Sequence, residues 1–407
     1  MNRKRSIVFA VLITFILTAL ITFGVVRLYD SGILSYLGIP APEKGLETLK
    51  RAEQLIDSKF YGEVDKDKLY EGALKGMLES LGDEYTWYVD EESYKNLSLN
   101  LTGEYTGIGV NVSIDSTDNL ITIISPIEDT PAYKAGLKAG DKIIAIDKLA
   151  VSLDNYQEAI NMMRGGEEKA GDEVVLSVKR AETGEVEEIT LVREHIVLKT
   201  VKSKLLPQNI GYVRITSFDE RTDKEFAQQL LDLKIETLDG LVIDLRNNGG
   251  GTLTSMQNIS DMLLPEGVIT YFEYKDGNKQ YFRSSDNYIG VPVSVIINGS
   301  SASASEAFAG AIRDHGRGTL VGEKSFGKGI VQTVYPFTKS EKGTTAIYIT
   351  TARYYTPNGE CIHGKGISPD IEVSLPEEYK YTNFDDLTIE QDTQLQIAWE
   401  NVLNKND

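Results

Sequence analysis

The sequence of 407 residues predicts a multidomain α+β protein that follows an apolar N-terminal segment. Three observations support this prediction: helical apolar spacing from Lys44 to about Asn96, short strands up to about Arg193, and alternating strands and helices beyond Lys199. At about 100–200 residues per domain, the length accommodates two to four domains, each with a sizeable core.

Composition excludes several classes of function. The chain carries 42 Lys and Arg against 61 Asp and Glu, and the net charge of −19 disfavours a general nucleic-acid binder. Its 41% hydrophobic and 25% charged residues are ordinary for a globular protein. The chain has one cysteine, Cys361, so it cannot form an intrachain disulfide framework. Its three histidines argue against a multi-histidine metal site. We therefore expect no metal and no cofactor.

The N-terminal segment predicts a membrane anchor. Residues 6–26 contain no charge, and at about 1.5 Å per residue they just span a hydrocarbon core of about 30 Å. The basic stub at residues 1–5 predicts a cytoplasmic N-terminus at the cell membrane, with the remainder outside. A cleaved signal peptide is the alternative, although no clear small-x-small cleavage site follows the run. Residues 27–43 carry Gly, Ser and Pro and predict a linker.

Four segments follow the linker. Residues 44–96 predict a small helical region, and residues 97–193 predict a compact module of five short strands and two helices. Residues 199–374 alternate buried strands with helices and are expected to form the largest domain. Residues 375–407 predict an acidic helical segment.

Three short motifs suggest chemistry that their surroundings do not support. Residues 322–328 have P-loop spacing, but Gly329 follows, which has no hydroxyl to bind Mg²⁺. The Ser-x-x-Lys at 325–328 matches penicillin-binding proteins, but its companion triplet at 285–287 precedes it, in the wrong order. His315 suggests a Ser–His triad, but the sequence has no Gly-x-Ser-x-Gly, and a cation at a helix C-terminus favours the helix dipole.

One serine-rich segment retains a chemical interpretation. Residues 301–306, Ser-Ala-Ser-Ala-Ser-Glu, follow a predicted buried strand and open a helix, where a hydroxyl lies beside free N–H groups. Taken alone, the run is also typical of an N-cap serine cluster. Two further segments favour catalysis. The glycine-rich loop at 244–251 suits an oxyanion hole. The segment 322–332 includes Lys328, which lies between Gly327 and Gly329 at the start of an apolar strand.

Residues 130–146 resemble a PDZ domain of the bacterial protease-linked type. Such a domain captures peptide C-termini by β-augmentation, and backbone N–H groups of a glycine-rich loop hold the terminal carboxylate. A plain hairpin with glycines is the alternative. The resemblance assigns peptide binding to Gly107, Ile108, Gly109 and Val110.

Residues 301–306, 322–329 and 351–359 together resemble the carboxy-terminal processing proteases, also called tail-specific proteases. The resemblance covers most of the chain from the helical region to Val373. It implies a crotonase-like core of β–β–α units that places a serine endopeptidase site between sheet and helices. It also implies that the outer helices, Lys44–Leu81 and Asp385–Lys405, serve dimerisation.

The same resemblance implies a Ser–Lys dyad. It makes Ser303 the nucleophile, with Ser305 as a rival, Lys328 the general base, and Gln332 a support for the lysine. A lysine base must be uncharged near neutral pH, and burial among apolar neighbours lowers the lysine pKa from about 10.4. Phe326 and the following strand are expected to supply that burial.

The implied oxyanion donors are the N–H groups of Ala304 and Gly250. Many family members have proline, which lacks an N–H, at the position of Gly249, so Gly250 is the preferred donor. Arg164 lies beside glycines at a turn of the PDZ-like module and is a candidate for gating. A solvated surface arginine is the alternative.

We therefore expect a membrane-anchored, extracytoplasmic serine endopeptidase that cleaves proteins recognised through their C-terminal tails. A non-catalytic PDZ scaffold that binds protein C-termini is the alternative from another functional class. The expected partners are polypeptide substrates, the membrane through one helix, and a second copy of the chain, but no nucleic acid.

Overall fold

The computed structural model describes residue 18 and residues 44–115, 118–340, 343–380 and 382–404, in two units, residues 1–77 and 78–407. The predicted anchor at 6–26 lies outside the described residues apart from Thr18, as do the stub and the linker. Among the residues that are described, no helix has both the length and the apolar character needed to cross a membrane.

The first unit contains α3 (Lys44–Lys59) and most of α4 (Lys66–Glu79). Polar contacts join the two helices: Lys66 Nζ lies 3.3 Å from Asp57 Oδ2, and the Tyr70 hydroxyl donates to Glu53 Oε1 at 2.6 Å. No residue of α3 is buried, and Leu46, Leu49 and Leu55 are exposed.

The predicted helical region at 44–96 is not helical throughout. Strand β1 (Trp87–Val89) pairs antiparallel with β18 (Gly343–Tyr355), a partner remote in sequence. Helix α5 (Glu91–Thr102) then begins at Asp90, whose side chain accepts the N–H of Ser93, and ends at Gly103 in the left-handed conformation. The predicted boundary at residue 97 therefore falls inside a helix.

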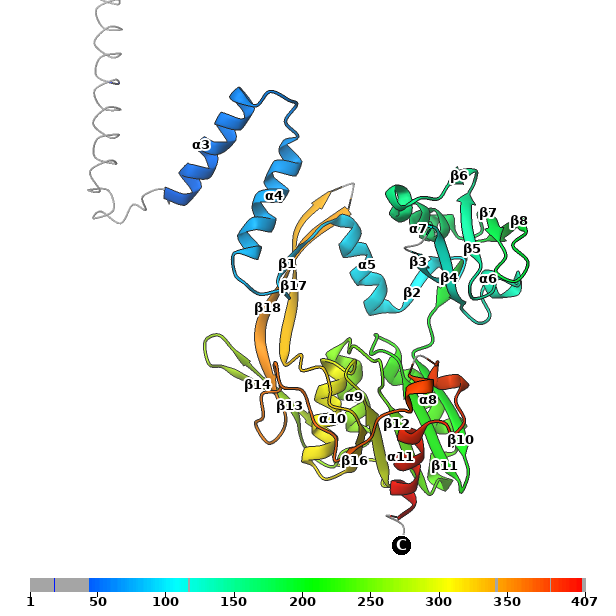
Figure 1. Cartoon of the computed structure of the whole chain (residues 1–407). Coiled ribbons are helices and arrows are strands. Elements are labelled where there is room, and N and C mark those ends of the chain that lie inside the picture. Colours follow the sequence, from blue (N-terminus) through cyan, green and yellow to red (C-terminus); the bar gives the residue numbers. More distant parts are fainter. Residues whose placement is uncertain (1–17, 19–43, 116–117, 341–342, 381, 405–407) are drawn as a thin grey trace, which may run out of the picture. The chain divides into compact units, whose positions relative to one another are not determined.

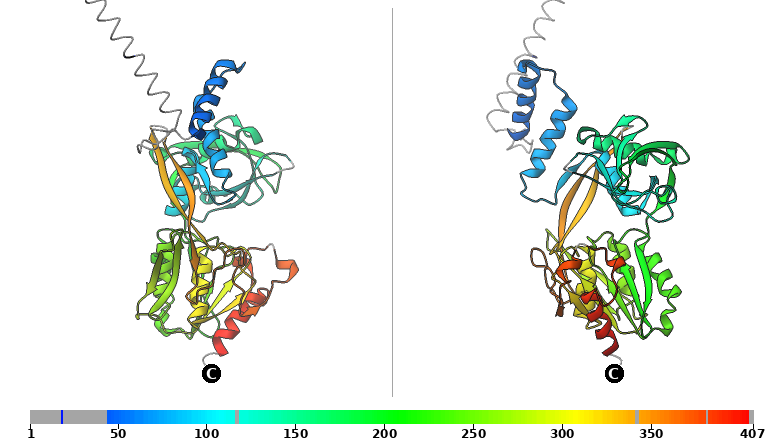
Figure 2. Two further views of the ribbon diagram at one scale, coloured as in Figure 1. Left: turned by 90° about the vertical axis from the view of Figure 1, so that its left-hand side faces the viewer. Right: turned by 45° about the vertical axis from the view of Figure 1, so that its right-hand side comes forward.

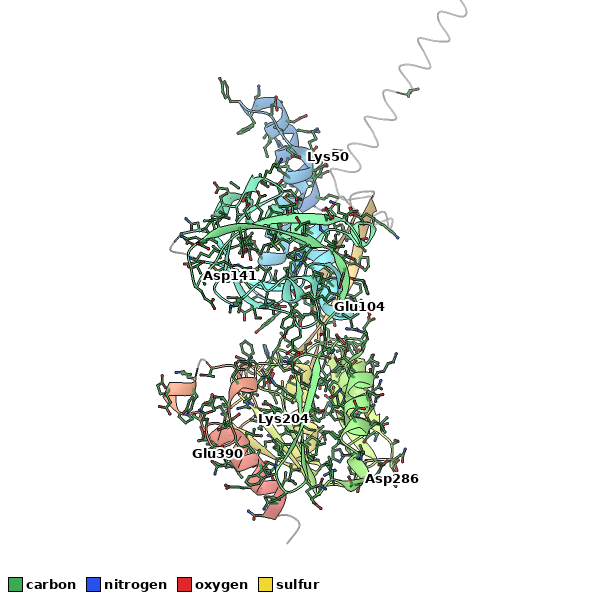
Figure 3. All side chains as sticks on the ribbon, turned by 90° about the vertical axis from the view of Figure 1, so that its right-hand side faces the viewer. Lys50, Glu104, Asp141, Lys204, Asp286 and Glu390 are labelled. Atoms are coloured by element: carbon green, nitrogen blue, oxygen red, sulfur yellow. The ribbon has the colours of Figure 1, made fainter. Side chains whose placement is uncertain are left out.

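The PDZ-like module follows α5. Asp141, which is almost fully buried, accepts hydrogen bonds from Arg180 Nη1 and from the N–H groups of Lys138 and Ala181, which fixes the entry to β5 (Figure 3). Alternate residues of β7 pack into the module core. The strands are β2 (Glu104–Gly107), β3 (Val110–Ile114), β4 (Ile121–Pro126), β5 (Lys142–Ile146), β6 (Leu149–Ala150), β7 (Glu173–Lys179), β8 (Val186–Val192) and β9 (Glu194–Val197), and the helices are α6 (Pro131–Lys134) and α7 (Tyr156–Arg164).

The largest domain is built on a mainly parallel sheet. All residues of β11, β12 and β15 are buried, as expected where helices cover both faces of a parallel sheet. From β11 to β19 the strands run parallel, and β10 joins antiparallel at the edge. The spatial order is β10 (Val201–Leu206), β11 (Ile210–Ile215), β12 (Gly240–Asp244), β15 (Val293–Ile297), β16 (Gly318–Gly322) and β19 (Ile371–Glu372).

Helices cover the two faces of this sheet (Figures 1 and 2). Helices α8 (Thr222–Asp232), α9 (Leu253–Asp261) and α10 (Ala304–Asp314) share one core with the sheet, and α11 (Thr393–Asn404) shares the other. The C-terminal helix packs Leu395, Ala398 and Val402 against the chain's own sheet, and its role in dimerisation stays a prediction.

A second sheet carries a long hairpin. Strand β18 pairs with β17 (Ile330–Ser340) on one side, and with β1 and β13 (Gly267–Tyr274) on the other, and β14 (Lys279–Ser284) pairs with β13. Strand β17 continues the loop that follows β16. The loops after the adjacent parallel strands β12, β15 and β16 meet at the carboxyl edge of the sheet, the edge at which such sheets bind ligands.

Candidate active site

Ser303 forms a sharp turn between β15 and α10. Its φ of 57° and ψ of −115° lie in a region that residues other than glycine rarely adopt, and such backbone costs about 1–3 kcal/mol. The Ser303 N–H donates to Glu306 Oε2 at 2.8 Å, and its carbonyl accepts the Tyr354 hydroxyl at 2.9 Å. This is the strained strand–turn–helix geometry of a nucleophile elbow, formed here without the Gly-x-Ser-x-Gly motif.

The glycine-rich loop after β12 packs directly against this elbow. A Cβ at Gly250 would lie 2.8 Å from Ser303 Cβ and 2.9 Å from the Ala304 nitrogen, so only glycine allows this approach. The buried Asn248 joins the two turns, because its carbonyl accepts the Ser305 hydroxyl at 2.9 Å. Ser305, the rival nucleophile, is thus fully buried and engaged, whereas Ser303 lines a cavity.

The two predicted oxyanion donors differ in their availability. Within the described part of the chain, the Ala304 N–H at the start of α10 donates to no group. The Gly250 N–H donates to Asn248 Oδ1 at 2.9 Å, and this corrects the prediction that Gly250 supplies a free donor. Asparagine side chains commonly accept the N–H two residues ahead in tight turns. Gly249 and Gly251 line the cavity, and their N–H groups have no partner among the described residues.

The buried carboxylate of Glu306 joins the elbow to the lysine loop. Its side chain is fully buried. One oxygen accepts the Ser325 hydroxyl at 2.6 Å and the Gly327 N–H at 2.7 Å. The other accepts the Lys328 N–H at 2.9 Å in addition to the Ser303 N–H. Glu306 had no role predicted from the sequence, although its position three residues after an N-cap serine is a capping-box signal.

Lys328 faces the same cavity as Ser303, which has a volume of about 470 Å³. Burial lowers the pKa of the Lys328 amine. The amine lies 5.1 Å from the centroid of the Tyr85 ring, and within the described residues it forms no hydrogen bond with Ser303. Ile330 is buried beside it, but Phe326, which was expected to contribute to this burial, is 56% exposed.

Gln332 also lines the cavity, but its side chain is engaged elsewhere. Its amide donates to Thr350 Oγ1 on β18 at 3.3 Å, and the structure gives it no hydrogen bond with Lys328 among the described residues. The predicted support of the lysine by Gln332 is therefore not formed in this conformation. Much of the cavity wall is apolar, contributed by Leu97, Leu101, Phe218, Leu253, Met256 and Phe272.

A second cavity of about 510 Å³ lies in the PDZ-like module between β3 and α7. Ile108, Gly109 and Val110 line it as predicted, whereas Gly107 belongs to β2 and does not. In the described chain, the N–H groups of Ile108 and Gly109 have no partner. Gly109 has a φ of 81°, and a Cβ there would lie 2.3 Å from the Thr130 side chain, so this loop requires glycine.

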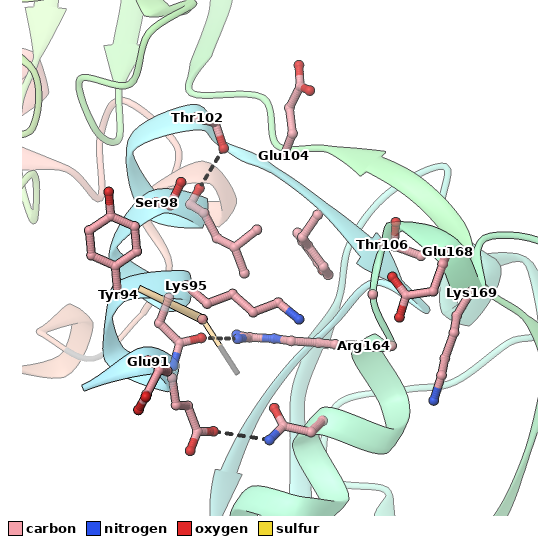
Figure 4. A pocket seen from close by; sticks show the side chains of 18 of the residues that line it. Glu91, Tyr94, Lys95, Ser98, Thr102, Glu104, Thr106, Arg164, Glu168 and Lys169 are labelled. Carbon is pink, nitrogen blue, oxygen red and sulfur yellow. Dashed lines mark hydrogen bonds between the residues drawn. The ribbon is translucent and has the colours of Figure 1, made fainter. Parts of the chain in front are cut away.

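Arg164 connects α7 to α5 (Figure 4). Its Nη1 donates to Asn96 Oδ1 at 2.8 Å, and its guanidinium lies 5.8 Å from the centroid of the Tyr105 ring. It lines both the cavity between β3 and α7 and a further cavity of about 880 Å³. Arg164 is thus half-buried and hydrogen-bonded, and its role in gating stays a prediction. Helix α5, which Arg164 contacts, also contributes Leu97 to the cavity that Ser303 lines.

Comparison with known protein families divides the chain in the same way. Residues 209–373 match Peptidase family S41, residues 106–191 match the PDZ domain, and residues 37–93 match the N-terminal domain described for the activating protease CtpB. A putative S41 protease from Bacteroides fragilis shares the fold, with a TM-score of 0.54 at 17% identity over 86% of this chain and 94% of that one.

Curated relatives match over most of their length. The carboxy-terminal processing protease CtpA of Bacillus subtilis is 34% identical over 387 residues, which is 95% of this chain and 80% of that protein. The carboxy-terminal-processing protease of Bartonella bacilliformis is 41% identical over 328 residues, 79% of this chain and 73% of that protein. The chain therefore belongs to the carboxy-terminal processing proteases, the PDZ-containing serine-type peptidases of family S41.

Proposed function

We propose that the chain cleaves polypeptides with Ser303 as nucleophile and Lys328 as general base. The observation that carries this proposal is that both side chains line one cavity while a single carboxylate, Glu306, holds both of their backbones. The lowered pKa of Lys328 favours the neutral amine that a base requires.

In the reaction, the Lys328 amine leaves the face of Tyr85 and accepts the proton of the Ser303 hydroxyl as Oγ bonds to the scissile carbonyl carbon. The same proton then passes to the leaving amine as the peptide C–N bond breaks. We assign one oxyanion donor to the Ala304 N–H and the other to the N–H of Gly249 or Gly251. Losing one such donor typically costs about 2.7–4 kcal/mol of transition-state stabilisation.

Substrates are recruited through the PDZ groove. An extended C-terminal tail would pair with β3, and the N–H groups of Ile108 and Gly109 would hold its carboxylate. The groove wall contains Ile160 and Met163 of α7, which suits an apolar last side chain. Arg164 is the proposed gating residue, because it connects this groove to α5 and thereby to the cavity that Ser303 lines.

We further propose that residues 6–26 anchor the protease with its catalytic domain outside the cytoplasm, on the basis of their uncharged, apolar sequence. Carbonate extraction of membranes tests this, because deletion of residues 1–26 should release the protein. The exposed apolar residues of α3 support a second copy as a partner. A monomeric mass in solution for the intact ectodomain would contradict the homodimer.

The catalytic assignment is tested with casein as an unstructured substrate, with and without an added apolar C-terminal peptide. Ser303→Ala and Lys328→Ala should each lose activity by at least about 10³-fold. Lys324→Ala, which removes a neighbouring exposed lysine, is the matched control and should remain active. Undiminished turnover in either active-site variant would refute the dyad. Peptide binding without cleavage by the unaltered chain would favour the scaffold instead.

A further inference from the structure

A buried ion cluster connects the C-terminal segment to the loop that faces Ser303. Arg246, in the loop after β12, is fully buried. Its Nη2 lies 2.5 Å from Asp244 Oδ2, and both terminal nitrogens bind Asp392, with Nη1–Oδ1 at 2.8 Å and Nη2–Oδ2 at 2.7 Å. Gln394 accepts from Nη1 at 3.1 Å. The paired contacts with two carboxylates fix both the position and the plane of the guanidinium.

Asp392 lies immediately before α11. Asp392 Oδ1 also accepts the Leu395 N–H at 3.0 Å, so one carboxylate both caps this helix and holds Arg246. The Phe384 ring covers the guanidinium, with its centroid 3.9 Å from Arg246 Cζ. The C-terminal segment thereby encloses the cluster.

The loop that carries Arg246 is attached to the elbow at its other end. Asn247 and Asn298 exchange two hydrogen bonds, because the Asn247 N–H donates to Asn298 Oδ1 at 3.0 Å and Asn298 Nδ2 donates to Asn247 Oδ1 at 2.8 Å. The Asn248 carbonyl accepts the Ala302 N–H at 3.0 Å. Two residues further on, Gly250 packs so closely against the elbow that a Cβ there would lie 2.8 Å from Ser303 Cβ. The position of Arg246 therefore determines how the chain leaves β12 toward these glycines.

We propose that Asp392 is a positioning residue for the glycine-rich loop at 244–251, which supplies the proposed oxyanion donors. By holding Arg246 from the far end of the chain, it fixes the place of Gly249–Gly251 beside Ser303. The inference rests on the proposed function, in which these N–H groups stabilise the tetrahedral oxyanion. Since the oxyanion forms only in the transition state, loss of Asp392 should lower kcat and leave KM almost unchanged.

Asp385 provides a matched control on the same segment. Its carboxylate accepts hydrogen bonds from Arg214 Nη1 at 3.1 Å and from Lys202 Nζ at 2.9 Å. Both donors lie on strands of the sheet and not on the glycine-rich loop. In the full-length chain, Asp392→Asn and Asp385→Asn should both lower the thermal midpoint. Only Asp392→Asn should lower kcat, by about tenfold or more per folded molecule, with KM for casein unchanged within about twofold.

A peptide aldehyde provides a readout that lost stability alone would not change, because it forms a tetrahedral oxyanion on the serine. Its inhibition constant should rise in Asp392→Asn in parallel with the loss of kcat, but not in Asp385→Asn. Should Asp392→Asn not fold, Asp392→Glu keeps the charge and shifts the carboxylate by one methylene, and its kcat should still fall. Equal kcat in the Asp392 and Asp385 variants, or unaltered kcat in folded Asp392→Glu, would overturn the inference. Activity retained by Ser303→Ala would instead overturn the proposed function, and this inference with it.

Discussion

Replacing Glu306 by glutamine tests whether one carboxylate positions both proposed catalytic residues. Glu306 accepts hydrogen bonds from Ser303, Ser325, Gly327 and Lys328, and it is fully buried. A glutamine amide accepts on one side only. If its oxygen faces the Ser303 and Lys328 N–H groups, its NH₂ can donate to the Ser325 oxygen, so the Gly327 N–H loses its acceptor and the Ser325 O–H must turn to another one. The opposite orientation leaves two N–H groups without acceptors.

The expected cost follows from this count. One buried N–H without an acceptor costs about 1–3 kcal/mol, so Glu306→Gln should lower the free energy of unfolding by about that amount. A displacement of about 1 Å at a catalytic group can cost on the order of 10²-fold in rate. We therefore expect kcat/KM to fall by about 10- to 100-fold, because both loops shift together.

Urea unfolding and casein turnover, measured on the same preparations, check both numbers. Glu360→Gln is the control, since this exposed glutamate pairs with Arg313 away from the cavity. If Glu306→Gln matched the unaltered chain in both stability and turnover, a positioning role for this carboxylate could not be maintained. A loss of stability without a loss of rate would show that Glu306 supports the fold but does not position the dyad.

Three further predictions concern the lysine, the glycine loop and the gate. Because only the neutral amine acts as a base and burial lowers the pKa of Lys328, kcat/KM should rise with pH through a midpoint below about 10.4; a midpoint at or above that value would contradict a buried base. Gly250→Ala should abolish turnover, since its Cβ would lie 2.8 Å from Ser303 Cβ, and normal turnover would exclude this loop geometry. Arg164→Ala should change the stimulation of casein cleavage by an apolar C-terminal peptide, because the bond to Asn96 is lost; identical stimulation would dismiss the gate.

The sequence predicts best those elements whose apolar pattern matches their surroundings. Strand β15 is a continuous apolar run because it is buried on both faces of a parallel sheet. Strand β1 was missed because three residues carry no periodicity of their own, and it exists through pairing with β18 more than 250 residues later. Helix α11 was predicted as a helix from its sequence, and Leu395, Ala398 and Val402 form the apolar stripe that faces the sheet.

The candidate site shows the same division between local and tertiary information. The family resemblance paired Ser303 with Lys328, and the two residues line one cavity because the loops that carry them follow adjacent parallel strands. It could not reveal Tyr85, which comes from a loop ahead of β1 to lie beside the lysine amine. The Gly250 prediction was wrong because it ignored a local competitor, the side chain of Asn248 two residues earlier.

The backbones around the dyad are fixed, whereas the lysine side chain is not hydrogen-bonded to its partner. Buried carboxylates hold the loops after β12, β15 and β16, through Asp392 on the first and Glu306 on the other two. In the proposed reaction, the step that remains is thus movement of the Lys328 amine from the Tyr85 face toward Ser303. Because α5 lines the same cavity and is bonded to the PDZ module through Arg164, peptide capture can act on the space available to that amine without disturbing either loop. We therefore expect peptide stimulation to change kcat more than stability, since the carboxylate contacts are already formed before the peptide binds.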